Sequence, residues 1–267
     1  MEGRAVLGVA FIGACALAVC AARAATTQQS GQYALAQGSA RIISHIALDK
    51  NGDLSVQQFA KGSRSPLSAC GSAKTHAPCY ESSDGQPVHV VLVRDDFGAF
   101  SHVHPQAHGS AYTVHVGLEP RRRYYAFVSS KIRNMPEQAF RFVLQSSAAP
   151  AHIPTTVRPI RRISVGPYDV SLEQPTAKAA HGAILNADIE RRPHTPGVSP
   201  FHAAWVQAVL VNTSTLTYAH IDGASDRGLC CEYALRVPPL SKGLYKLWLQ
   251  FDDGTATYTA PLTFSAQ

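Results

Sequence analysis

Short runs of apolar and β-branched residues, separated by turn residues, recur along most of this chain. They lie at residues 88–93, 112–118, 140–144, 206–211, 245–251 and 257–264. Runs of this length, rich in Val, Tyr, Phe and Thr, are typical of the short strands of β-sandwiches. No segment keeps a 3.6-residue apolar period between proper helix caps. The pattern therefore predicts an all-β protein with antiparallel sheets.

Two parts of the chain repeat the same landmarks. His89 precedes His102 by 13 residues, and Gln207 precedes His220 by the same interval, which gives an offset of 118 between the two parts. Farther along, at an offset of 121, the matched pairs are Tyr112 with Tyr233 and Tyr124 with Tyr245. A register kept over this many positions indicates two copies of one domain.

The repeat divides the chain into four parts. Residues 25–146 are expected to form the first β-sandwich and residues 163–267 the second. Residues 147–162, with Ala-Ala-Pro and Ile-Pro sequences, are expected to be the linker. Residues 1–24 have the single early Arg, the apolar stretch and the Ala-Arg-Ala end of a signal peptide that is cleaved after Ala24. The mature protein is thus expected in the periplasm or outside the cell. Lipidation at Cys15 or Cys20 in this leader, which would anchor the protein to a membrane, is an alternative to cleavage after Ala24.

Export changes the interpretation of the cysteines, because disulfides form in oxidising compartments. Four cysteines remain after cleavage. Cys70 and Cys79 enclose a short loop and are expected to form a disulfide that staples it. The adjacent Cys230 and Cys231 leave three alternatives, namely a strained vicinal bridge, two thiols, or thiolate ligands of a soft metal.

Composition excludes several classes of protein. Of the 267 residues, 45% are hydrophobic and 16% are charged, which is not the composition of a disordered chain. The formal net charge is +6, but the basic residues form no long run, so nucleic acid is not an expected partner. After the leader, no stretch has the roughly 20 apolar residues of a membrane helix.

One group of histidines has a spacing that suits metal binding. His102 and His104 are two positions apart, so on a strand both side chains leave the same face. An acidic turn before them is expected to fold the preceding strand back, which would bring His89 beside them. Three neutral imidazoles suit Cu(II) or Zn(II), and His108 or His115 are close enough in sequence to add a fourth ligand. The alternative is a hydrogen-bonded histidine ladder that only holds the hairpin.

The second copy offers a weaker counterpart of this site. Its corresponding residues are Gln207, His220 and Asp222. Because glutamine is a poor ligand for a transition metal, a separate site in this copy is expected to be weak or lost, and replacing His220 is expected to matter little.

The segment from Asp49 to Asp53 begins like a calcium-binding loop. An EF-hand requires Gly at its sixth position and Glu at its twelfth, and this segment has neither. Asn51-Gly52 between two apolar runs is better explained as a hairpin turn. Calcium is therefore not an expected ligand, and no motif for an organic cofactor is present.

A family resemblance rests on these motifs. The segment HVVLVRDDFGAFSHVHP resembles the motif of bacterial exported proteins with tandem immunoglobulin- or cupredoxin-like sandwiches, in which a His-initiated strand leads through an acidic turn to a His-x-His-Pro strand. The segments GPYDVSLEQP, HAAWVQAVLVNTSTLTYAHIDG and KGLYKLWLQFDDGTATYTAPLTF are similar to the closing domain of that family. Several members are associated with copper or other heavy metals, and the family is largely uncharacterised. The second copy departs from the motif, with Gln207, Asp222 and Gly223 in place of His, His and Pro.

These observations favour an exported, non-enzymatic protein that binds copper or zinc through the histidines of its first domain. The second interpretation is a metal-free, immunoglobulin-like module that binds a protein of the cell envelope. A metal-dependent hydrolase ranks third, because the sequence has no nucleophile elbow, no phosphate-binding glycine loop and no His-Glu-x-x-His motif.

Overall fold

The computed structural model describes residues 31–32, 41–71, 77–82, 86–145, 157–173, 176–177, 182–200, 204–223 and 231–267. The fold is all-β, as the sequence predicts, and its sheets are almost entirely antiparallel. No helix in the described ranges has the length and apolar character needed to cross a membrane. The predicted signal peptide and most of the predicted linker lie outside these ranges, as does Cys230.

The first half of the chain folds as a sandwich of two sheets. The larger sheet has the order β1 (Gly31–Gln32), β10 (Gln138–Gln145), β9 (Arg123–Ile132), β5 (Val88–Arg94) and β6 (Phe100–Val103), and β4 (Tyr80–Glu81) also pairs with β9. The smaller sheet has the order β2 (Ile42–Leu48), β3 (Asp53–Ala60), β8 (Ala111–His115) and β7 (Gln106–His108). The side chains buried between the two sheets, such as Leu54, Val90 and Phe142, form one hydrophobic core.

The second half is also a sandwich of two sheets, and the strand order of its larger sheet is equivalent to that of the first half. One sheet has the order β13 (Thr176–Ala177), β19 (Thr257–Ala266), β18 (Gly243–Asp252), β15 (Val206–Asn212) and β16 (Tyr218–Gly223). The other has the order β11 (Arg162–Val165), β12 (Tyr168–Leu172), β14 (Ala183–Arg191) and β17 (Glu232–Val237). Its separate core includes Tyr168, Leu235 and Leu247. Ile160, just before β11, also packs against this core.

Strand registers repeat between the halves as the sequence offsets predict. In the first half Val91 pairs with His102, and in the second half Val209 pairs with His220. His102 and His220 thus occupy equivalent positions on β6 and β16.

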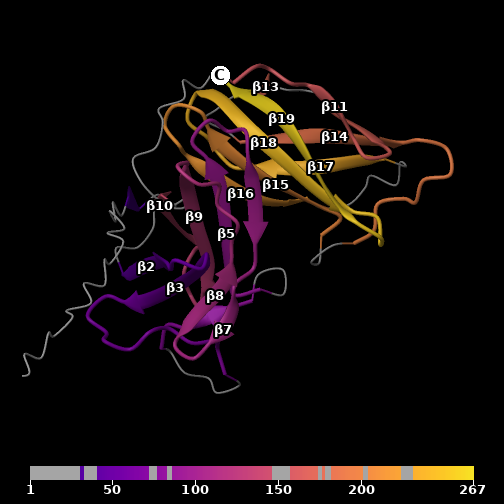
Figure 1. Cartoon of the computed structure of the whole chain (residues 1–267). Coiled ribbons are helices and arrows are strands. Elements are labelled where there is room, and N and C mark those ends of the chain that lie inside the picture. The colour runs from indigo at the N-terminus through magenta and orange to yellow at the C-terminus, as the bar shows by residue number, and fades with distance from the viewer. Residues whose placement is uncertain are drawn as a thin grey trace, which may run out of the picture.

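The two sandwiches pack together through their larger sheets (Figure 1). A third hydrophobic cluster joins Val91, Val93 and Phe127 of the first half to Val209, Val211, Tyr218 and Trp248 of the second. Strands β5 and β15 are consequently buried on both faces, which explains why their sequences are nearly continuous apolar runs instead of alternating ones.

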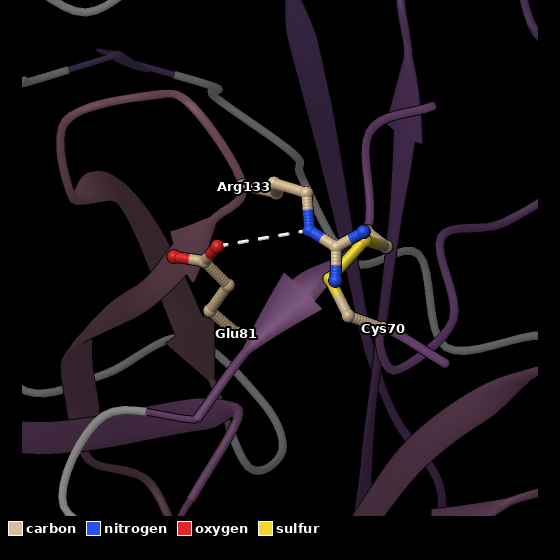
Figure 2. The surroundings of a disulfide bond; sticks show 4 residues. Cys70, Glu81 and Arg133 are labelled. Carbon is tan, nitrogen blue, oxygen red and sulfur yellow. Dashed lines mark ion pairs between the residues drawn. A yellow bond between two sulfur atoms is a disulfide. The ribbon is translucent and has the colours of Figure 1, made fainter. Parts of the chain in front are cut away.

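A disulfide closes the loop before β4. Cys70 and Cys79 are bonded, with their Cα atoms 5.0 Å apart, as the sequence predicts. Figure 2 shows the bond beside Glu81 and Arg133, which form an ion pair of 3.7 Å. The bond therefore anchors the loop where it joins β4, at the margin of the first sandwich.

Candidate metal centre

Three histidines from both halves of the chain meet where the two larger sheets face each other. His89 lies on β5, His102 on the adjacent β6, and His220 on β16 of the second half. Each offers a ring nitrogen, and the three nitrogens lie within 4.8 Å of one another. The His89 side chain is almost completely buried, with 2% of its surface exposed, and the other two are partly buried. The sequence alone placed His220 in a separate, weaker site, but the structure brings it into the same cluster.

The spacing of His89 and His102 fits a shared ion. His89 Nδ1 and His102 Nε2 are 3.3 Å apart. Two nitrogens bound tetrahedrally at about 2.0–2.1 Å from zinc are separated by about 3.3 Å. Since the three nitrogens lie within 4.8 Å of one another, bringing the widest pair to that separation requires a movement of at most about 1.5 Å.

A residue of the second half fixes the proton on His102. Gln250 on β18 accepts a hydrogen bond from His102 Nδ1, with a distance of 2.8 Å between Nδ1 and Oε1. Because a carbonyl oxygen only accepts, the His102 proton resides on Nδ1 and the lone pair on Nε2. The lone pair of His102 Nε2 can thus accept a hydrogen bond from His89 Nδ1 or bind a metal ion.

His104 lies at the margin of the same cluster. Its ring centroid is 4.8 Å from that of His89 and 4.8 Å from that of His102. It follows the end of β6 and does not belong to the group whose ligand atoms converge. The sequence predicted the proximity of His89, His102 and His104, but the third converging ligand is His220.

Burial and mutual repulsion keep His220 neutral. Desolvation lowers its pKa well below the usual value of 6.5, and the neighbouring His102, His89 and His104 lower it further. A neutral imidazole is the form that binds a metal ion, so His220 is held ready to act as a ligand at neutral pH.

The remaining members of the expected second-copy site have different positions. Gln207 lies on β15, is fully buried, and is opposite Asp222 on β16 and Gln250 on β18. The side chain of Asp222 lies outside the described residues.

The two additional histidines expected from the sequence are not at the cluster. His108 and His115 belong to β7 and β8 of the smaller sheet, on the other side of the first core. His115 Nδ1 instead contacts Asp53 Oδ1 at 3.1 Å and lines a surface cavity of about 310 Å³ beside the turn of residues 49–52.

The turn of residues 49–52 is a hairpin, as the sequence predicts. It connects the antiparallel strands β2 and β3. Asp49 Oδ1 accepts hydrogen bonds from the backbone N–H groups of Asn51 and Asp53 at 2.8 and 2.9 Å, and Gly52 has a φ of +90°. The Asp49 carboxylate is thus used to hold the turn.

A family model matches part of the chain. Residues 163–267 match a family described as "Domain of unknown function (DUF8832)". This range covers the second sandwich, including His220 and Gln250, and not the strands that carry His89 and His102. No curated protein matches the chain.

Sequence reasoning did not identify Gln250 or the contact between the two sandwiches. A signal for the contact was present, because 88–93 and 206–211 are apolar at nearly every position and not at alternate ones. Such strands are buried on both faces and therefore need a second packing partner.

Proposed function

We propose that this protein binds one transition-metal ion, copper or zinc, between its two β-sandwiches. The observation that carries the proposal is the convergence of ring nitrogens from His89, His102 and His220 within 4.8 Å. Imidazole nitrogen is a common ligand of both metals. The bond from His102 to Gln250 supports the proposal, because metal-binding histidines commonly donate their other N–H to an acceptor.

The protein holds the ion without catalysing a reaction. Among the described residues, the ring nitrogens that converge belong to His89, His102 and His220. Export of the chain through its leader would place this binding in the periplasm or at the cell envelope. The resemblance of the first-half motif to exported proteins associated with heavy metals agrees with such a role.

The structure also favours a second candidate function for the histidines. His89, His102 and Gln250 form a continuous chain of contacts of 3.3 and 2.8 Å across the two halves. Such a chain could fix the two sandwiches in one orientation without any ion. In that case the protein is a metal-free module that presents its outer surface to an envelope protein.

Calorimetric titration with Cu(II) and with Zn(II) at pH 7.5 separates the two functions. We expect the mature protein to bind one equivalent of at least one of these ions. His102→Ala should weaken binding by more than the roughly 10–100-fold that loss of an outer-shell partner costs. His115→Ala removes an exposed histidine from the smaller sheet and serves as the matched control. Absence of binding by the unaltered protein would instead favour the metal-free module.

A further inference from the structure

Gln207 has a side chain that the packing of the two sandwiches does not explain. Its exposed fraction is 0%, and neither Oε1 nor Nε2 has a hydrogen-bond partner in the described part of the chain. An amide buried in this way is costly, and such groups in native proteins usually have a partner or a role. A leucine of similar size would fill the same space without that cost.

The side chain of Gln207 faces the contact between the two sandwiches. Its neighbours Val206 and Ala208 belong to the core of the second sandwich, whereas Val209 and Val211 belong to the cluster between the halves. Because side chains alternate along a strand, Gln207 points to the same side as Val209 and Val211. Gln207 on β15 is also directly opposite Gln250 on the adjacent strand β18, and Gln250 is hydrogen-bonded to His102.

The contacts between the halves are reciprocal: exchanging each residue for its counterpart in the other half gives a second contact of the same kind. Phe100 stacks on Trp248 with centroids 4.7 Å apart, and the equivalent pair, Tyr218 on Phe127, is stacked at the same distance. The exchange also relates His102 to His220, since both have the same register position.

The same exchange relates His89 to Gln207. His89 is the second residue of β5, after Val88, and Gln207 is the second residue of β15, after Val206. The ring centroid of His89 is 5.5 Å from that of His102 and 5.1 Å from that of His220. Because the exchange interchanges His102 and His220, the position equivalent to that of His89 belongs to Gln207.

We propose that Gln207 completes the metal centre by supplying its side-chain Oε1 as a fourth and weaker ligand. This inference rests on the proposed function. A neutral amide oxygen is a weaker donor to copper or zinc than imidazole, and glutamine is a known weak axial ligand of copper. The centre would thus have three strong ligands and one weak one.

Two substitutions at Gln207 and one control test the assignment, with Cu(II) as the probe. Gln207→Leu removes the donor and keeps the volume, and Gln207→His restores the residue type of the first copy. Gln138→Leu is the control, because Gln138 is also buried, with a side-chain Oε1 that has no partner in the described residues, but lies on β10 facing the first core. Affinity is measured by competition titration, and the coordination of Cu(II) by its electron paramagnetic resonance spectrum.

We expect Gln207→Leu to weaken Cu(II) binding by about tenfold and to change the spectrum, without lowering the melting temperature of the metal-free protein. Gln207→His should bind more tightly than the unaltered protein and show an additional nitrogen in its spectrum. Gln138→Leu should leave both readouts unchanged.

Three results would overturn the assignment in different ways. If the unaltered protein binds Cu(II) and Gln207→Leu has the same affinity and spectrum, Gln207 is not a ligand and the three-histidine centre stands. A spectral change in His104→Ala with none in Gln207→Leu would transfer the fourth position to His104. If the unaltered protein binds no copper or zinc, the proposed function fails and this assignment fails with it.

Discussion

His102 and His220 occupy the same register position in the two halves of the chain and meet with their ring centroids 5.0 Å apart. Each ring belongs to a different sandwich, and their planes are nearly perpendicular. A ligand set of this kind is not a property of either half alone. It is created by the way the two larger sheets pack.

The first prediction concerns His220. Because its ring nitrogen converges with those of His89 and His102, His220→Ala should weaken binding of Cu(II) or Zn(II) as severely as His102→Ala, by more than about 100-fold. Calorimetry on both variants measures the effect. Strong binding retained by His220→Ala alone would restore the earlier expectation of a centre confined to the first half.

The second prediction concerns Gln250, which acts through His102. Gln250→Leu removes the acceptor of the Nδ1 proton and should reduce metal affinity by about 10–100-fold. Gln250→Glu keeps an acceptor at that place and should retain most of the affinity. Isothermal titration of the two variants distinguishes an orienting role from simple packing. If Gln250 only packed, Gln250→Glu would not bind the metal more tightly than Gln250→Leu.

The third prediction concerns the apolar part of the contact between the halves. Trp248 is buried and stacks against Phe100 and Phe97 of the other sandwich. Trp248→Ala should lower the free energy of unfolding by about 3–5 kcal/mol, through lost burial and a cavity. Metal affinity should fall as well, because the sheets that carry the ligands lose their common support. Denaturant unfolding and metal titration on one preparation test both effects, and undiminished affinity would contradict the second.

The fourth prediction concerns acid stability at the turn between β5 and β6. Burial raises the pKa of Asp96, but hydrogen bonds from Arg94, the Gly98 backbone N–H and Arg122 outweigh it and lower the pKa to about 2. The folded-state pKa lies below the unfolded value of 3.8, so this carboxylate stabilises the fold above pH 4. The contribution, about 1–2 kcal/mol, is lost as the pH falls through about 2.

Asp96→Asn provides the measurement for this fourth prediction. Its deficit in unfolding free energy relative to the unaltered protein should be largest near neutral pH and should shrink as the pH falls from 4 to 2. Urea unfolding at a series of pH values gives the difference. A deficit that does not change with pH would mean that the carboxylate charge does not contribute.

Local features were predictable from the sequence because local chemistry determines them. The Asn51-Gly52 turn requires a residue that tolerates positive φ, and the valine-rich runs at 88–93 and 206–211 favour strands. The Cys70–Cys79 bridge follows from a short loop between two cysteines. The proximity of His89 and His102 follows from two strands joined by a tight turn.

The composition of the histidine cluster was not predictable in the same way. His220 is 118 residues from His102, and no pattern along one strand indicates which outer face of a sandwich packs against another. Gln250 is separated from His102 by 148 positions and is on a different sheet. Because the motif occurs in two copies, the sequence suggested two separate sites. The structure instead brings residues of both copies into one cluster.

The stacking of Phe100 on Trp248 and the equivalent stacking of Tyr218 on Phe127 make the interface between the halves reciprocal. Such a reciprocal interface is what two identical subunits form when they associate around a two-fold axis. Joining the subunits in one polypeptide removes the dependence of that association on concentration. It also permits what a symmetric pair of identical chains cannot have, a histidine at position 89 opposite a glutamine at position 207. A single chain with a pseudo-symmetric interface can therefore carry an asymmetric cluster of side chains within it.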